Sequence, residues 1–360
     1  HSHGARSIYV GLPALPASAC TVRTRCRPAC RRAPVTVCAG NGRVMTPSAA
    51  EEQALHETPP QRILLAPRGI ERAVYALLKV LAHLPLGVWR GLGVILGWVV
   101  YLFLDMARNR RRIADVNLQL CFPEQDAAHR QRLIRQHCVR LAQSMLDRIW
   151  LWHGSEALVR RRVRLVGDSA AVLAPRPTVL FAPHFLGMDA GGMLLAPLLQ
   201  TRACVSIYTP LRNAPLDRWV RRGRSRFPNN LPVWRGDGIK PVVAALRKGG
   251  VLYLLPDMNF GAEESIFVEF FGQPAATIPS LARFARLGRA QVITAVTYME
   301  PHGYSLHLSP PWSDFPTGDV RADTQRMNSH LETWVRQRPE EYFWLHKRFK
   351  TRPPGMPPVY

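Results

Sequence analysis

Downstream of residue 160, short apolar runs alternate with stretches of helical periodicity. The run Thr178-Val179-Leu180-Phe181-Ala182 predicts a short buried strand. Similar runs predict strands at 203–208, 250–255 and 290–298. The intervening segments predict helices at 187–199, 214–225, 239–248 and 279–288, with one more at 323–338. Strands that alternate with helices predict an α/β fold, with a mixed, largely parallel sheet flanked by helices.

Before this region lies an apolar segment of a different kind. Residues 91–104 form a run of 14 residues without a charge, whereas a helix that crosses a bilayer needs about 20. Extending the run back to Leu84 gives 21 residues, if Arg90 snorkels to the membrane surface. Trp89, Trp98 and Tyr101 are residues that favour membrane interfaces. Residues 70–106 therefore predict a membrane anchor or interfacial helices; the alternative is a buried core helix.

A basic cluster follows the apolar run. Arg108, Arg110, Arg111 and Arg112 favour the cytoplasmic side of a membrane and could hold anionic head groups. Residues 108–154 then predict helices, with a break at Phe122-Pro123.

The ends of the chain differ in character from its middle. Residues 1–44 contain seven Arg, four of the seven Cys and no Asp, Glu or Lys. We expect them to be a non-native or disordered leader; a transit peptide has the same composition. Residues 45–69 predict a flexible lead-in, 107–353 the main domain, and 354–360 a loose tail.

The net charge of +23 indicates an anionic partner: a nucleic acid, an anionic lipid or an acidic protein. Without residues 1–44 the charge is 23 − 7 = +16, and three cysteines remain: Cys121, Cys138 and Cys204. Three scattered cysteines without a CxxC pair predict neither a metal site nor a disulfide framework. We also expect no cofactor.

The candidate catalytic residues follow the first predicted strand. His184 and Asp189 lie five residues apart after the strand that ends at Ala182, and functional sites of α/β sheets gather at the carboxyl ends of strands. A histidine there can act as a general base on a hydroxyl. A carboxylate about one turn further on can accept a hydrogen bond from the other ring nitrogen and orient the base. Spacing alone allows a second interpretation, a histidine at a helix start.

Four segments in order carry a family resemblance. His184 to Asp189 resembles the H-x4-D/E motif of the glycerolipid acyltransferase superfamily. Residues 113–124 resemble the entry segment of the lipid A late (lauroyl/myristoyl) acyltransferases, and Pro256 to Gly261 resembles their PDxDYG block, continued through 268–277. Residues 342–353 resemble their C-terminal signature. Phe260 replaces the Tyr of that block, which makes this position a poor catalytic candidate.

The resemblance implies an acyltransferase domain over 107–353. It also implies transfer of a fatty acyl group from acyl carrier protein to a hydroxyacyl chain of a lipid A precursor. His184 would deprotonate the hydroxyl, Asp189 would orient His184, and Arg224 would stabilise the oxyanion. The implied site is on the cytoplasmic side of the inner membrane, so the expected partners are the carrier protein, the lipid precursor and the membrane, without nucleic acid.

Five further residues are candidates for substrate binding. Arg222 and Arg226 flank Arg224 in the basic segment, and their alternative role is contact with phosphate or membrane. Asp257 and Asn259 follow the strand at 250–255 and are expected to face the same cleft as His184. Thr277 is expected in the wall of the acyl channel or in a turn.

Three rival functions remain open at this point. An acyltransferase for a glycerophosphate or an ornithine lipid would use the same His184 and Asp189 chemistry. A binding protein of the same fold would not need His184. A nucleic-acid-binding protein would account for the charge, but it gives no reason for the apolar run at 91–104.

Overall fold

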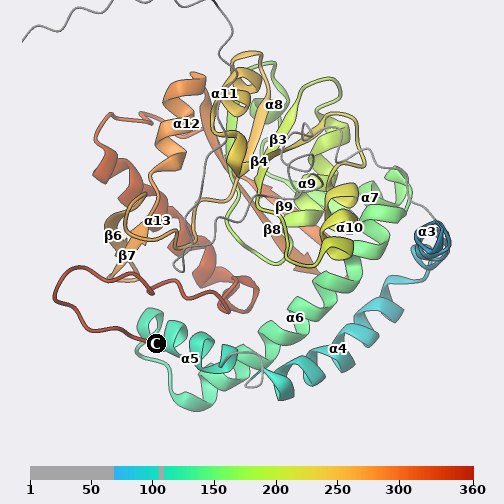
Figure 1. Ribbon diagram of the computed structural model, residues 1–360, viewed down its shortest axis with the longest axis horizontal. Coiled ribbons are helices and arrows are strands. Elements are labelled where there is room, and N and C mark those ends of the chain that lie inside the picture. Colours follow the sequence, from blue (N-terminus) through green and yellow to red (C-terminus); the bar gives the residue numbers. More distant parts are fainter. Residues whose placement is uncertain (1–68, 105–108) are drawn as a thin grey trace, which may run out of the picture. The chain divides into compact units, whose positions relative to one another are not determined.

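The computed structural model describes residues 69–104 and 109–360. The predicted leader, nearly all of the lead-in, and the junction at 105–108 lie outside the described residues. The described chain forms an α/β unit in which helices cover a twisted central sheet (Figure 1).

The central sheet has seven strands in the order β1-β9-β8-β2-β5-β3-β4. Their bounds are Val163–Val166 (β1), Thr178–Phe181 (β2), Cys204–Tyr208 (β3), Asn230–Trp234 (β4), Val251–Leu254 (β5), Gln291–Glu300 (β8) and Gly303–Leu308 (β9). All neighbouring pairs are parallel except β8 and β9, which form an antiparallel hairpin. The predicted mixed, largely parallel sheet is therefore confirmed. A separate antiparallel pair, β6 (Ile266–Phe270) and β7 (Gln273–Thr277), lies beside the C-terminal helix α13.

The helices match the predicted ones closely in the α/β region. They are α9 (Met188–Leu198), α10 (Ala214–Arg224), α11 (Lys240–Arg247), α12 (Ser280–Gly288) and α13 (Val320–Gln337). The short elements are α7 (Glu156–Arg162), α8 (Ala170–Leu173), η1 (Arg235–Asp237) and η2 (Pro339–Glu341). The strands β1, β4, β6, β7 and β9 were not predicted. In β1 exposed and buried positions mix, and Pro232 interrupts the apolar run of β4, so neither stands out as a buried run.

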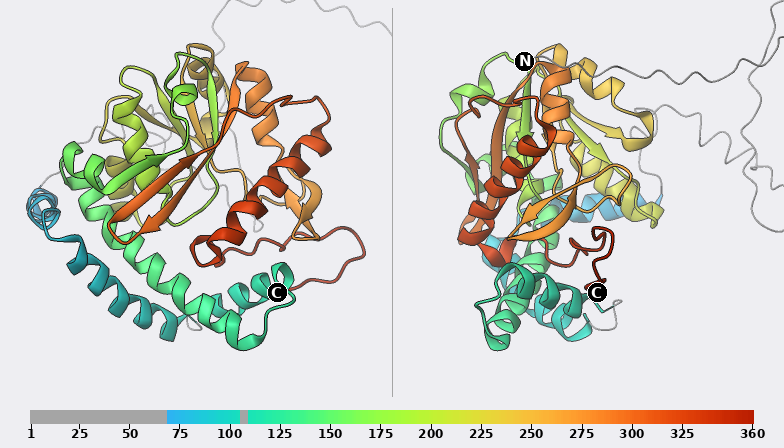
Figure 2. Two further views of the ribbon diagram at one scale, coloured as in Figure 1. Left: turned by 180° about the vertical axis from the view of Figure 1, so that it is seen from behind. Right: turned by 90° about the vertical axis from the view of Figure 1, so that its left-hand side faces the viewer.

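The helices before the sheet are α3 (Ile70–Leu81), α4 (Leu86–Phe103), α5 (Arg110–Cys121) and α6 (Ala127–His153). Among the described residues, α4 is the helix that is long and apolar enough to cross a membrane, and only 17% of it is buried. It lies alongside α6 (Figures 1 and 2). Gly93 and Gly97 permit this approach, because a Cβ on either one would come within 2.4 Å of α6 atoms.

Arg90 of α4 does not snorkel as predicted. Its side chain is 13% exposed, and its guanidinium pairs with the fully buried Asp147 of α6 at 3.1 Å. Tyr304 and Trp150 also donate to the Asp147 carboxylate, at 2.6 and 2.8 Å. The charge of Arg90, which the sequence assigns to the membrane surface, thus holds α4 against α6.

Replacing Arg90 with leucine should therefore destabilise the protein. Removing one partner of a buried ion pair costs about 3 kcal/mol or more, since the other charge stays buried. Thermal and denaturant unfolding of the detergent-solubilised protein would measure the loss. Arg112→Leu at an exposed position is the matched control, and a combined Arg90→Leu/Asp147→Asn variant should recover part of the stability. Equal losses in Arg90→Leu and Arg112→Leu would contradict the role given to the pair.

The C-terminal tail also differs from its prediction. Its last residue, Tyr360, packs against the core, donates a hydrogen bond to Asn117 and accepts one from the amide of Phe349 at 3.0 Å. A segment predicted as loose is therefore held at its end, because a terminal aromatic side chain finds a partner that the local sequence does not reveal.

Candidate active site

A cavity of about 890 Å³ opens at the carboxyl ends of β2, β3 and β5. Its polar wall includes His184, Asp189, Arg224, Asn259 and His346. Its apolar wall includes Met193, Ile207, Pro232, Ile239, Leu254 and Phe284. A cavity with a long apolar wall and a few converging polar groups suits a ligand that is mostly hydrocarbon.

The position of His184 follows from the sheet. The strands β2 and β5 are buried along their lengths and pair in parallel, with Phe181 opposite Leu254. The segments that follow them therefore leave the sheet side by side, and they carry His184 and Asp257. The imidazole Nδ1 lies 2.8 Å from Asp257 Oδ1, and the His184 amide donates to Asp257 Oδ2 at 3.0 Å. The carboxylate thus holds both the ring and the backbone of His184.

This pairing corrects the predicted partner of His184. The sequence assigned Asp189 to the second ring nitrogen, whereas Asp257 occupies that position. The side chain of His184 remains 24% exposed while that of Asp257 is fully buried. Because Nδ1 is engaged by the carboxylate, Nε2 is the ring nitrogen left for a ligand in the cavity.

The environment keeps Asp257 ionised. Burial alone would raise its pKa, but the His184 ring and the two hydrogen bonds from His184 outweigh this effect and lower the pKa of Asp257. An ionised, fully buried carboxylate favours the Nδ1–H tautomer and stabilises an imidazolium when one forms.

Asp189 lies at the start of α9 and is held by two arginines. Arg148 of α6 contacts Asp189 Oδ2 at 2.9 Å, and Arg224 of α10 donates through Nε to Asp189 Oδ1 at 2.8 Å. Burial opposes ionisation, but Arg224 and Arg148 together lower the pKa of Asp189 to about 2. Asp189 is therefore an anion that joins three helices and orients the Arg224 guanidinium.

Arg224 lines the same cavity as His184. Its bond to Asp189 uses Nε, so the two terminal nitrogens make no hydrogen bond to any other residue that the structure describes. The pKa of Arg224 is raised, chiefly by the charge of Asp189, so the guanidinium stays cationic. It can donate two hydrogen bonds to an oxyanion in the cavity.

Asn259 and His346 form a third polar contact in the cavity wall. The amide of Asn259 donates to His346 Nε2 at 3.0 Å, and the Asn259 side chain bonds to Arg348, Gly261 and Thr351. Burial lowers the pKa of His346 to about 4, helped by the positive charge of the nearby Arg348. A neutral ring whose Nε2 already accepts a hydrogen bond is suited to a structural role rather than to a second base.

Three of the predicted substrate-binding residues lie elsewhere. Arg222 pairs with Glu71 of α3 at 3.3 Å and lies over the Tyr75 ring. Arg226 donates to the carbonyls of Leu151 and Gly154 at the end of α6. Thr277 is fully buried and accepts from Arg348 at 2.7 Å. Each of these side chains fixes one element against another, so none of them forms part of the cavity wall.

Two residues of this site were not predicted from the sequence. Arg148 lies on a helix with ordinary amphipathic spacing, and nothing local distinguishes it from the other arginines of α6. Tyr253 of β5 lines the cavity and donates to the Met188 carbonyl at 3.0 Å. Tyr253 could have been recognised as a candidate, because it is a polar residue within a buried strand.

The cavity therefore holds a candidate base, His184, with Nε2 free, and a cation, Arg224, with both terminal nitrogens free. Such a site can take a proton from a hydroxyl and stabilise a developing oxyanion. Among residues 69–104 and 109–360 no group of three or more His, Cys, Asp or Glu could hold a metal ion.

Comparison with known proteins identifies the family. The sequence model described as bacterial lipid A biosynthesis acyltransferase matches residues 61–351. The chain is 31% identical to the lipid A biosynthesis palmitoleoyltransferase of Escherichia coli K12 over 295 residues, which cover 76% of this chain and 94% of the relative. It is 29% identical to the lauroyltransferase of the same strain, with 79% and 92% covered. A Haemophilus influenzae lipid A biosynthesis acyltransferase is 32% identical, with 75% and 81% covered.

The extent of these matches decides the classification. The family model covers the apolar helix α4, the H-x4-D segment, the Asp257 block and nearly all of the C-terminal signature. This chain belongs to the bacterial lipid A biosynthesis acyltransferase family.

Proposed function

We propose that this protein transfers a fatty acyl group from acyl carrier protein to the 3-hydroxyl of an acyl chain on a lipid A precursor. The observation that carries the proposal is the His184–Asp257 pair, whose free Nε2 faces the same cavity as the Arg224 guanidinium. Family membership supports the reaction class, and the apolar wall of the cavity supports a fatty acyl ligand.

The proposed reaction has two steps in one site. His184 Nε2 takes the proton of the acceptor hydroxyl, and the oxygen attacks the thioester carbonyl carbon of the donor. Arg224 donates to the resulting oxyanion. When the tetrahedral intermediate collapses, the C–S bond breaks and the imidazolium returns its proton to the departing thiolate. The products are an ester and a free carrier thiol, and His184 is neutral again.

Asp189 has a different role from the one its motif first suggested. Its contacts with Arg148 and Arg224 make it the residue that positions the oxyanion donor, while Asp257 positions the base. Each of the two catalytic groups thus has its own buried carboxylate.

We infer that the enzyme works at the cytoplasmic face of the inner membrane. The support is α4, with exposed apolar side chains at Val94, Ile95, Val99, Leu102 and Phe103. The basic residues at 110–112 follow the C-terminal end of that helix, and by the positive-inside rule they favour the cytoplasmic side for that end.

An acyl-transfer assay tests the function. The purified chain would receive a lipid A precursor with acyl carrier proteins loaded with 12-, 14- or 16-carbon chains, and mass spectrometry would record the added mass. We expect one acyl addition that requires the carrier-bound donor, with a His184→Ala protein as the inactive control. Transfer to a glycerophosphate or ornithine lipid in place of the precursor would contradict the proposed acceptor. Equal activity with free acyl-coenzyme A would contradict the proposed donor.

A further inference from the structure

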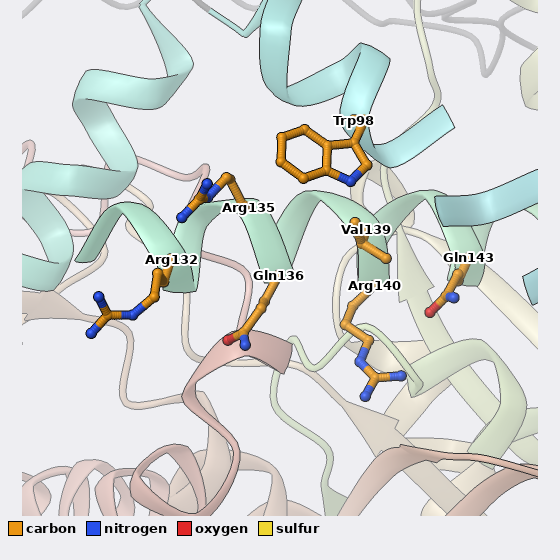
Figure 3. A pocket seen from close by; sticks show the side chains of 7 residues that line it. All are labelled: Trp98, Arg132, Arg135, Gln136, Val139, Arg140 and Gln143. Atoms are coloured by element: carbon orange, nitrogen blue, oxygen red, sulfur yellow. The ribbon is translucent and has the colours of Figure 1, made fainter. Parts of the chain in front are cut away.

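A second cavity, of about 390 Å³, lies between the anchor helix α4 and helix α6. Figure 3 shows its lining: Trp98 comes from α4, and the other six side chains come from α6, namely Arg132, Arg135, Gln136, Val139, Arg140 and Gln143. We call it the α4–α6 groove. It shares no lining residue with the cavity at His184, so it is a separate site.

The α4–α6 groove concentrates positive charge. Its three arginines, Arg132, Arg135 and Arg140, form no ion pair with a carboxylate in the part of the chain that the structure describes. Arg132 and Arg140 are separated by two helical turns and lie on the same side of α6 in Figure 3, while the Arg135 guanidinium lies 5.8 Å from the Trp98 ring. Like charges along one side of a helix repel one another, and a bound anion would relieve this repulsion.

Gln143 adds a directional requirement at one end of the groove. Its side chain is buried, since the residue is 6% exposed, and its Nε2 donates to the Arg90 carbonyl at 3.1 Å. Gly93 packs closely against the Gln143 side chain, which limits rotation away from this bond. The Oε1 atom is left as a buried acceptor without a hydrogen-bond partner. The complementary ligand group is a hydrogen-bond donor such as a hydroxyl.

The position of the groove indicates where the ligand comes from. Trp98 is 47% exposed and belongs to the apolar stripe of α4 that includes Ile95 and Leu102. A lipid whose head group occupies the groove can therefore lay its acyl chains along this stripe. Indole rings favour the head-group level of a bilayer, and arginines bind phosphate through bidentate hydrogen bonds.

We propose that the α4–α6 groove binds the head group of an anionic glycerophospholipid, with phosphatidylglycerol as the best fit. The phosphodiester contacts the three arginines, and a hydroxyl of the terminal glycerol donates to Gln143 Oε1. The site holds the enzyme in a defined orientation at the membrane. It does not take part in acyl transfer, so this proposal can fail or hold independently of the proposed function.

Titration of the detergent-solubilised full chain with dioctanoyl phosphatidylglycerol tests the site, with native mass spectrometry as the readout. We expect one tightly bound lipid per chain, and weaker binding of dioctanoyl phosphatidylcholine. Arg132→Gln/Arg135→Gln/Arg140→Gln should raise the Kd about a hundredfold, because each basic residue near anionic lipid contributes roughly a factor of five. The control removes three exposed charges elsewhere, as Lys248→Gln/Arg286→Gln/Arg321→Gln, and should leave the Kd unchanged.

Gln143→Met separates the hydroxyl contact from the charge. This variant keeps the three arginines and the side-chain volume, so we expect it to bind phosphatidylglycerol and dioctanoyl phosphatidic acid equally, whereas the wild-type chain prefers the former. Competition binding to the wild-type chain is a further test that does not depend on whether a variant folds. Displacement of the bound lipid by millimolar inorganic phosphate would reduce the groove to a simple phosphate site. Displacement by a lipid A precursor would make it a substrate subsite, and an unchanged Kd in the arginine variant would remove the site altogether. Each of these outcomes overturns the proposal.

Discussion

Asp257→Asn is expected to lower kcat about a thousand- to ten-thousandfold, close to the loss expected from His184→Ala. The asparagine keeps the size of the side chain, but it offers a single acceptor and no charge. It therefore cannot hold the His184 Nδ1–H tautomer and stabilise the imidazolium at once, and in an established triad the corresponding change costs about ten-thousandfold. Steady-state acyl transfer at saturating donor and precursor would measure the effect.

Thermal unfolding distinguishes this role from a loss of folding. The pKa of Asp257 is lowered in the folded protein, so Asp257 is already ionised in the neutral range and its own titration should not shape the pH–rate profile of the wild type there. Thermal unfolding should shift far less than the rate. A kcat for Asp257→Asn within tenfold of the wild type would show that another group orients His184. A cooperative unfolding transition lost in Asp257→Asn would instead show that the carboxylate mainly holds the backbone of His184, whose amide it also binds.

The sequence was sufficient to place His184 after a buried strand, but not to identify the carboxylate that pairs with it. His184 follows a fully apolar run, and that run reports a buried strand without knowledge of the rest of the fold. The partner depends on which strand lies next to β2. The neighbour is β5, more than 70 residues further along the chain, and only the sheet order places Asp257 beside His184. A carboxylate one turn away in sequence was the natural candidate, yet the first turn of α9 directs Asp189 towards α6 and α10.

The arginines of α10 also show that the sequence does not reveal which groups a side chain contacts. Successive residues of a helix are rotated by about 100°, so neighbours in the sequence face different surroundings. Arg221 and Arg224 are three residues apart and both line the cavity, whereas Arg222 faces Glu71 of α3. The sequence reports a basic segment but not the rotation of the helix, because that rotation is set by packing against α6 and α9.

Arg224→Gln is expected to lower kcat about a hundred- to a thousandfold, the usual cost of removing one oxyanion donor. Asp189→Asn should produce a loss of similar size, because the neutral amide no longer orients the guanidinium through its Nε bond. If the two residues act as a unit, the double variant should lose little more than either single one. The donor KM should change less than kcat, since the contact strengthens only when the oxyanion forms.

Arg221→Gln is the matched control for this pair. Arg221 lies on the same helix and lines the same cavity, but it pairs with Asp217 at 2.9 Å instead of Asp189. The kcat of Arg221→Gln should fall by no more than about threefold, if the loss in Arg224→Gln does not come simply from removing a charge from the cavity wall. An Arg224→Lys protein should recover only part of the rate, because an ammonium group cannot hold Asp189 and donate two hydrogen bonds to the oxyanion in the same geometry. Additive losses in Asp189→Asn and Arg224→Gln would separate the two residues and would leave Asp189 as a link between helices alone.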